Sequence, residues 1–146
     1  MNTSALAKAV CVAVISLAAA RVVADERQAN APPSLPERLE QKLKGDDKPF
    51  TLVIQIAIKP GAEEKFEAAA AKAAKASAGD EGCLTYEFNR NLEQPGHYVL
   101  VERWTGLAAL RKHLDKPHTK QILAVFGELT TGPRKAEIFA PIGGKE

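Results

Sequence analysis

Cysteine is scarce in this sequence, and the apolar run near its start is too short to cross a bilayer comfortably. Cys11 and Cys83 are the two cysteines among 146 residues. The run from Ala9 to Leu17 falls short of the about 20 residues that a membrane-spanning helix needs. Lys8 precedes it and small residues follow it, which is typical of a secretory leader. We expect residues 1–24 to be a signal peptide; a retained membrane anchor is the alternative.

The mature chain also lacks an excess of charge of one sign. Cleavage after residue 24 takes Lys8 and Arg21 from the 20 basic residues and leaves the others balanced against the 18 acidic ones. A nearly neutral chain gives no electrostatic reason to expect a nucleic-acid partner. Cleavage leaves Cys83 as the one cysteine, which excludes an internal disulfide. We expect an exported protein, periplasmic or secreted, with no stable membrane span after cleavage.

A recognisable metal or phosphate site is missing as well. His113 and His118 are five residues apart across a proline, and His97 is far from both in sequence. No cysteine or carboxylate cluster completes a zinc set, and the match to a facial iron triad is weak. The loop PGAEE, after the first predicted strand, lacks the glycines of a phosphate-binding loop. We therefore predict no metal, while haem binding through a single histidine stays open.

Residues 25–48 are polar and contain Pro32, Pro33 and Pro36, so they separate the leader from the folded part. We expect an arm with a short helix over 36–44, and we favour a spacer over a strap that binds a partner. The folded domain is predicted over 49–142, followed by a short tail at 143–146.

Hydrophobic periodicity within 49–142 indicates alternating strands and helices. A period of two residues predicts strands, and a period of about 3.6 residues predicts helices. The resulting order β-α-β-β-α-β predicts an α+β fold of the ferredoxin-like type, an antiparallel sheet with helices on one face. The expected strands are 50–59, 83–90, 98–105 and 135–142, and the expected helices are 62–77, 106–114 and 118–128.

The face of the sheet that the helices leave open is partly apolar. Val53, Ala57, Val99 and Val101 point to it by alternation. An apolar face of this size is usually covered, and a second copy of the chain is the economical cover. We therefore predict a homodimer with sheet packed against sheet.

Three short motifs make the chain resemble the antibiotic biosynthesis monooxygenase domain family. They are Glu81-Gly82-Cys83 with Tyr86, then VLVERW at 99–104, then HLDKPH at 113–118, within a resemblance that spans residues 50–142. The resemblance implies a dimeric α/β-barrel whose sheets face each other. It also implies oxidation of a phenolic or quinol substrate with O₂ as co-substrate, without metal or flavin, and it places Trp104 in the substrate cavity.

Glu102 and Trp104 are two apart on a predicted strand, so both face the helices. Trp104 is interpreted as a wall of the substrate cavity or as the largest core residue. A buried carboxylate needs a donor or a proton, and His113 is the partner that we expect for Glu102. His113 falls at the edge of the apolar helix stripe, where an exposed position is the alternative to a catalytic one. His118 follows Pro117, and helix capping is its alternative role.

Two functions follow from these residues. In the first, the chain is a monooxygenase in which His113 or His118, oriented by Glu102, removes the proton of a phenol or quinol. The residues expected to contact the aromatic substrate are Trp104, Tyr86, Leu110 and Phe126. In the second, the same cavity belongs to a non-catalytic dimeric module that binds an aromatic small molecule or haem.

Overall fold

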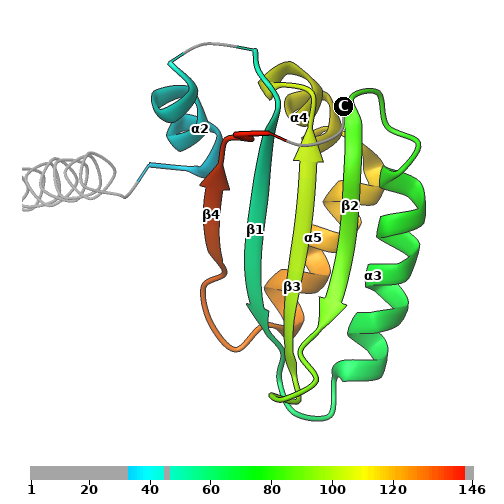
Figure 1. Cartoon of the computed structure of the whole chain (residues 1–146). Coiled ribbons are helices and arrows are strands. Elements are labelled where there is room, and N and C mark those ends of the chain that lie inside the picture. Colours follow the sequence, from blue (N-terminus) through cyan, green and yellow to red (C-terminus); the bar gives the residue numbers. More distant parts are fainter. Residues whose placement is uncertain (1–32, 45–46, 144–146) are drawn as a thin grey trace, which may run out of the picture. The chain divides into compact units, whose positions relative to one another are not determined.

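The computed structural model describes residues 33–44 and 47–143 (Figure 1). The chain divides into two units, and the second, residues 35–146, contains every helix and strand described. The predicted signal peptide at 1–24 lies outside the described residues. Within the described ranges, no helix has both the length and the apolar character needed to cross a membrane.

Four antiparallel strands form one sheet in the spatial order β2-β3-β1-β4. β1 at the centre pairs with β3 on one side and with β4 on the other. This is the strand order of the predicted ferredoxin-like fold, and the predicted α+β class is confirmed. The strands are β1 (Phe50–Ala57), β2 (Cys83–Arg90), β3 (His97–Trp104) and β4 (Lys135–Phe139).

The long helices α3 (Glu63–Ser77) and α5 (Pro117–Leu129) cover one face of the sheet (Figure 1). The short helix α4 (Leu107–Leu114) follows β3 directly. The strand side chains on this face are buried in alternation, as the period of two predicted. Each large apolar side chain buried here contributes about 1.5–3 kcal/mol to folding. The largest fully buried ones include Phe50, Leu52, Phe66, Leu100, Trp104 and Leu110.

Two local features differ from the predicted pattern. Regular alternation along CLTYEF would put Leu84 on the same side as Tyr86, but a register shift between Cys83 and Thr85 leaves Leu84 half exposed. Such a bulge adds one residue to a strand and interrupts its alternation. Thr105 precedes α4 and is a residue type that caps helices, but α4 has no cap from its own N-cap side chain. The backbone N–H of Ala108 instead donates to Oδ1 of Asp47 at 3.4 Å.

The second half of the polar segment 25–48 packs on the domain. Helix α2 (Leu35–Leu43) corresponds to the short helix expected over 36–44, shifted by one residue, and its Leu39 is fully buried in the core. Nη2 of Arg38 donates to the carbonyl oxygen of Ala136 at 2.9 Å, and Glu40 forms an ion pair with Arg111. The preference for a spacer was therefore wrong for this helix, because buried Leu39, with Leu35 and Leu43 packed against the core, anchors the polar segment to the domain.

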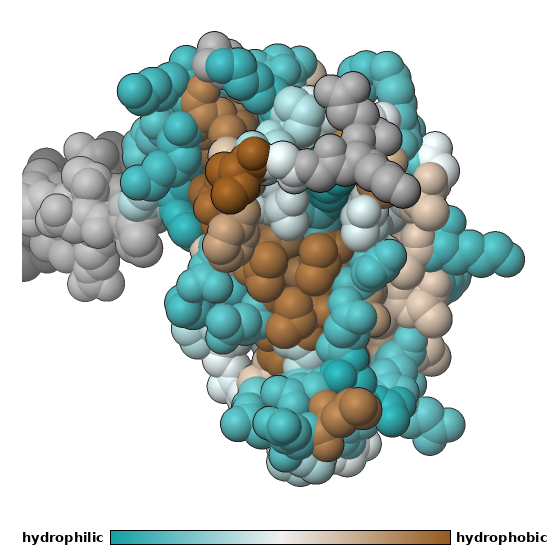
Figure 2. All heavy atoms as spheres, in the orientation of Figure 1, coloured by the Kyte–Doolittle hydropathy of each residue, from teal (hydrophilic) through white to brown (hydrophobic). Residues whose placement is uncertain are grey.

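The open face of the sheet has an apolar centre. Figure 2 shows this area over β1 and β3, with hydrophilic side chains around it. Val53, Ala57, Val99 and Val101 are half-buried there, and Val53 lies opposite Val101 in the strand register. We propose that a second copy of the chain covers this face.

A charge at the centre of the open face tests the dimer. We expect the full chain to sediment as a dimer at micromolar concentration and Val101→Asp to sediment as a monomer, because burying an unpaired carboxylate costs several kcal/mol. The control is Leu92→Asp in the β2–β3 hairpin, where the side chain is 90% exposed. This control should remain a dimer. A wild-type chain that is monomeric throughout would contradict the proposal.

Candidate functional site

The helix-facing end of β3 places a carboxylate beside an indole in the core. Trp104 is fully buried and Glu102 is 5% exposed. Nε1 of Trp104 donates a hydrogen bond to Oε2 of Glu102 at 2.9 Å. Both side chains leave the same face of the strand because they are two residues apart. The prediction that both look inward is therefore correct, but the partner of Glu102 is Trp104 rather than His113.

Burial dominates the electrostatics of Glu102. Loss of solvation raises the pKa of this carboxyl to about 7, and the hydrogen bond from Trp104 acts in the opposite direction. A neutral N–H donor stabilises the carboxylate less than water does, so the burial effect prevails. Glu102 therefore changes its charge near neutral pH, which is the range in which a general base works best.

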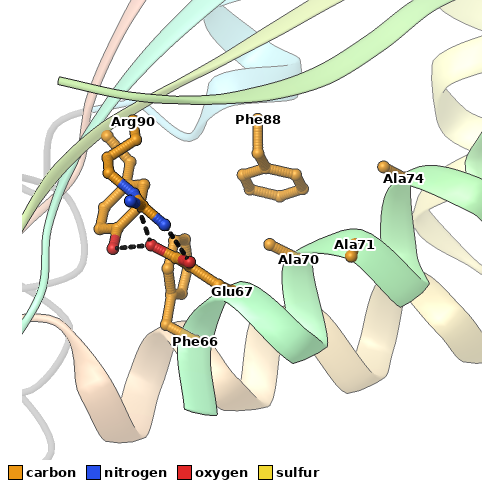
Figure 3. A pocket seen from close by; sticks show the side chains of 8 residues that line it. Phe66, Glu67, Ala70, Ala71, Ala74, Phe88 and Arg90 are labelled. Carbon is orange, nitrogen blue, oxygen red and sulfur yellow. Dashed lines mark hydrogen bonds and ion pairs between the residues drawn. The ribbon is translucent and has the colours of Figure 1, made fainter. Parts of the chain in front are cut away.

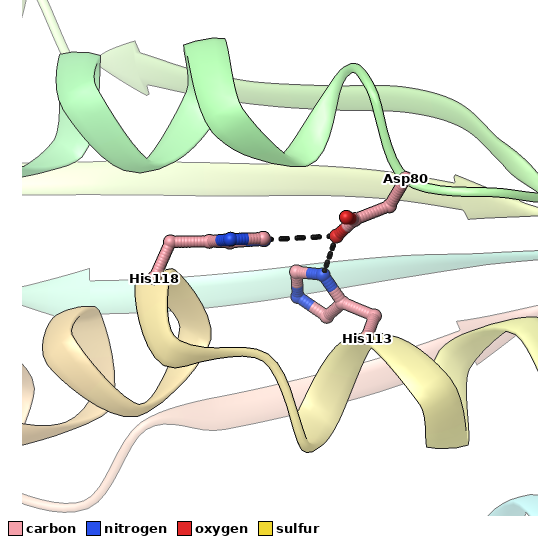
Figure 4. Close-up of side chains that lie close together, drawn as sticks. All are labelled: Asp80, His113 and His118. Atoms are coloured by element: carbon pink, nitrogen blue, oxygen red, sulfur yellow. Dashed lines mark hydrogen bonds and ion pairs between the residues drawn. The ribbon is translucent and has the colours of Figure 1, made fainter.

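His113 and His118 converge on a single oxygen of Asp80 (Figure 4). Nδ1 of His113 lies 2.7 Å from Oδ2 of Asp80, and Nε2 of His118 lies 2.9 Å from the same oxygen. The Asp80 and His113 side chains are 9% and 2% exposed, and that of His118 is 22% exposed. We call these three residues the Asp80 cluster.

The cluster holds its carboxylate in the charged form. Burial acts to raise the pKa of Asp80, but the hydrogen bonds from His113 and His118 outweigh it and lower the pKa. An ionised carboxylate only accepts, so both imidazoles donate N–H to Asp80. Burial lowers the pKa of His113 despite the opposing effect of Asp80. Its Nε2 lies 3.2 Å from the hydroxyl oxygen of Thr119.

These contacts correct two alternatives and reveal one missed residue. His113 is buried rather than exposed, and His118 bonds Asp80 rather than capping α5, whose N-cap is Lys116. The sequence showed no carboxylate cluster to complete a metal set with the two histidines, and the fold brings Asp80 to them. One feature of the sequence could have pointed to Asp80: it is an acidic residue in the glycine-flanked turn that follows α3. This turn lies at the end of the sheet where α4 also lies.

The predicted substrate contacts are core residues that surround this region. The Tyr86 ring lies 5.2 Å from that of His113 and 6.5 Å from that of Trp104, centre to centre. Burial, followed by the charge of Glu102, raises the pKa of Tyr86, which keeps the phenol neutral. Leu110 and Phe126 are also buried, and the ring centres of Phe126 and Phe88 are 6.2 Å apart.

A cavity of about 260 Å³ lies between α3 and the outer strand β2 (Figure 3). Its apolar wall is made by Phe66, Phe88 and the alanines of α3. At its polar side, Glu67 accepts hydrogen bonds from Nε of Arg90 at 2.8 Å and from the Tyr98 hydroxyl at 2.7 Å. A cavity of about 150 Å³ can hold a benzene ring, so this aromatic cavity has room for a larger aromatic molecule. The small alanine side chains of α3 leave this space.

The raised pKa of Glu102 makes a testable contribution to stability. Below pH 4.5 the carboxyl is protonated in both states, and between 4.5 and about 7 the folded state binds more protons than the unfolded state. The free energy of unfolding due to this group therefore falls by about 3 kcal/mol as the pH rises through that window. Glu102→Gln should remove this fall.

Urea unfolding of wild type and variant across that pH range checks the prediction. The difference between the two proteins isolates Glu102, because the contribution of His113, which has the opposite sign, is present in both. Glu93→Gln, an exposed hairpin position, is the control and should follow the wild type. A constant difference between wild type and Glu102→Gln at all pH values would contradict the raised pKa.

The family described as antibiotic biosynthesis monooxygenase matches residues 49–125. The chain is 27% identical over 94 residues to a Mycobacterium tuberculosis protein named "Putative monooxygenase Rv0793", covering 64% of this chain and 92% of that protein. It is 27% identical over 84 residues to "Putative monooxygenase YcnE" of Bacillus subtilis, covering 58% and 88%. An "Uncharacterized protein sll1783" of Synechocystis is 26% identical, covering 69% of each chain.

Solved structures agree with this match. The structure of Rv0793 from Mycobacterium tuberculosis superposes with a TM-score of 0.63 at 25% identity, covering 68% of this chain and all of that one. That of PA3566 from Pseudomonas aeruginosa has a TM-score of 0.61 at 23% identity, covering 66% and 96%, and shows the shared fold. The family match covers more than half of the sequence and includes Glu102, Trp104 and the Asp80 cluster. The chain belongs to the antibiotic biosynthesis monooxygenase family.

Proposed function

We propose that the chain is a monooxygenase that oxidises a small phenolic or quinol-type molecule with O₂, and that Glu102 is its general base. The observation that carries the proposal is the buried Glu102–Trp104 pair, a carboxylate that ionises near neutral pH among aromatic rings. Family membership supports a monooxygenase-like activity. The phenolic or quinol substrate and the use of O₂ are proposed in addition to what family membership supports.

The substrate ring enters the aromatic cavity and packs against Phe66 and Phe88. The strand register connects this cavity to the base: Phe88 lies opposite Leu100, and the next inward pair along the same strands is Tyr86 opposite Glu102. The aromatic rings of Phe88 and Tyr86 pack edge to face, with their centres 5.8 Å apart. Glu102 does not itself line the cavity, so a substrate hydroxyl directed along β2 has to pass the Tyr86 side chain to reach the carboxylate.

Proton transfer to Glu102 starts the reaction. The carboxylate takes the hydroxyl proton and leaves an electron-rich phenolate, which passes one electron to O₂. The resulting radical pair combines at a ring carbon that bears a hydrogen, and protonation by Glu102 gives a ring hydroperoxide. That carbon then loses its proton as the O–O bond breaks, so that one oxygen atom stays as a quinone carbonyl and the other leaves with the proton as water. The substrate supplies the electrons, while the protein supplies orientation, exclusion of water and control of the proton.

This assignment changes the predicted roles of the histidines. We predicted His113 or His118 as the base with Glu102 as the orienting group. Both imidazoles are committed to Asp80 through an N–H, whereas Glu102 accepts one bond from Trp104. Glu102 is therefore the better proton acceptor, and the mechanism assigns no step to the Asp80 cluster.

The aromatic cavity favours one other function, the binding of an aromatic molecule without turnover. Its ring-lined wall and the Arg90–Glu67 pair suit such a ligand whether or not a reaction follows. Binding of a quinol that leaves unchanged, without O₂ uptake, would select this function. Under both functions we propose that the chain is exported to the periplasm or the medium. Determining the N-terminal sequence of the secreted chain would test this.

Loss of the base should remove most of the activity. We expect O₂ uptake with at least one member of a quinol panel, with kcat/KM rising as the pH increases through about 7. Glu102→Gln should lower kcat/KM by about 100-fold or more, the usual contribution of a general base. Glu93→Gln should keep the wild-type rate. Uptake that never exceeds the buffer rate, or a fully active Glu102→Gln, would contradict the proposal.

Removing only the indole N–H should move the pH profile. In Trp104→Phe an aromatic ring remains, but Glu102 loses the hydrogen bond that lowers its pKa. The midpoint of the profile of kcat/KM should therefore shift to higher pH, while the rate at high pH approaches that of wild type. A profile that falls uniformly without a shift would show that Trp104 acts only by packing.

A further inference from the structure

The proposed reaction leaves the Asp80 cluster without a role, although its buried and partly buried groups converge on one point (Figure 4). Two imidazole nitrogens and a carboxylate oxygen lie within 4.8 Å of one another. They come from three places in the fold: the turn after α3, the last turn of α4 and the first turn of α5. We propose that Asp80, His113 and His118 bind a divalent first-row transition-metal ion, with Zn²⁺ as the leading candidate.

The spacing suits such an ion. In a tetrahedral site with metal–ligand bonds of about 2.0–2.1 Å, neighbouring ligand atoms are about 3.3 Å apart. The two nitrogens are 2.7 and 2.9 Å from Oδ2 of Asp80. Each of these two distances has to increase by roughly half an ångström. The two nitrogens, which lie within 4.8 Å of each other, have to take up the same spacing.

The protons can leave the ligand atoms without a change in charge. A neutral His113 that now donates from Nδ1 can carry its proton on Nε2 instead, and Nδ1 then has a free lone pair for the metal. Nε2–H would donate to the Thr119 hydroxyl, 3.2 Å away and buried. A metal-binding histidine usually donates its second N–H to such a partner, which fixes the ring orientation. His118 can make the same change of tautomer.

The backbone around the ligands is held in place. The N–H of Asp80 donates to the carbonyl of Ser77 at 3.0 Å, and that of Cys83 donates to the carbonyl of Asp80 at 3.1 Å. Lys116 N–H donates to the carbonyl of His113 at 3.0 Å, which fixes the short link between the two histidines. A site with its scaffold already ordered loses little conformational freedom when the ion binds.

The ligand set predicts which ion binds and how. Imidazole with carboxylate suits Zn²⁺, Co²⁺ or Ni²⁺ better than Mg²⁺ or Ca²⁺. In the part of the chain that the structure describes, no fourth histidine, cysteine or acidic residue joins the set. Three protein ligands leave a position open to water, as in exchangeable sites rather than closed structural ones. The partly exposed His118 also lines a cavity of about 160 Å³ between α3 and α5, which gives the ion a path.

Trp104 provides a direct readout because it is the one tryptophan of the chain. Its ring lies 4.7 Å from that of His113. Paramagnetic Co²⁺ bound by His113 should quench the fluorescence of Trp104, whereas diamagnetic Zn²⁺ should compete with Co²⁺ and restore it. The experiment uses the full chain without a histidine tag and needs no substrate, so it is independent of the oxygenase proposal.

We expect one Co²⁺ per chain, with quenching that saturates and is reversed by Zn²⁺, and heat of Zn²⁺ binding in calorimetry. His118→Ala and Asp80→Asn should each weaken binding by at least about tenfold, because each removes a ligand. His97→Ala is the matched control, since this histidine is exposed in the β2–β3 hairpin. Cys83→Ser controls for binding by the thiol. Both controls should bind like the wild type.

Either of two results would overturn the proposal: no quenching and no binding heat at metal concentrations well above that of the protein, or equal binding by wild type and His118→Ala. Loss of binding in His97→Ala or Cys83→Ser would place the site elsewhere and would also overturn it. Circular dichroism of each variant confirms folding. Should Asp80→Asn fail to fold, His118→Ala carries the test, because its side chain is 22% exposed in the wild type.

Discussion

The proposed chemistry depends on one buried hydrogen bond, from the indole N–H of Trp104 to the carboxylate of Glu102. Placing a carboxylate inside a protein costs several kcal/mol unless it is protonated or paired. A single neutral donor compensates only part of that cost, so the group takes a proton near neutral pH instead of staying charged. Burial therefore makes Glu102 a candidate base, and the hydrogen bond from Trp104 keeps its pKa from rising further.

The fold explains why this pair and the aromatic cavity lie close together. Alternation along β2 and β3 puts Tyr86, Phe88, Glu102 and Trp104 on the face covered by helices. The alanines of α3 approach that face without filling it, which leaves the cavity beside Phe88. The Asp80 cluster lies by Trp104 at the Cys83 end of β2, while the cavity lies toward the Arg90 end. The helix-covered face thus carries the proposed base, a space for a ring and the proposed metal site.

Sequence patterns were sufficient for the fold and for the inward direction of β3. A period of two residues assigns Glu102 and Trp104 to the buried face without any tertiary information, and the β-α-β-β-α-β order limits the topology. The pairing of polar groups was not predictable in the same way. Asp80 is 33 residues from His113, and only the packing of the α3 turn against α4 brings their side chains together.

Alternation also failed where the backbone departed from regular geometry. The bulge around Leu84 turned a residue with a core-like side chain toward solvent, and nothing in the letters CLTYEF marks such a shift. Likewise, the segment of α2 is mostly polar in sequence, yet Leu39 is fully buried and Leu35 and Leu43 pack against the core. These cases share a cause: a few tertiary contacts outweigh a weak local pattern.

The pKa of the Glu102 carboxyl itself is the most direct test of this account. Labelling the glutamate side-chain carboxyls with ¹³C and following their chemical shifts against pH would give each midpoint, with Glu102→Gln identifying the resonance. The account predicts a midpoint of about 7 for Glu102. A midpoint near 4.5, the ordinary value for glutamate, would contradict it and remove Glu102 as the base.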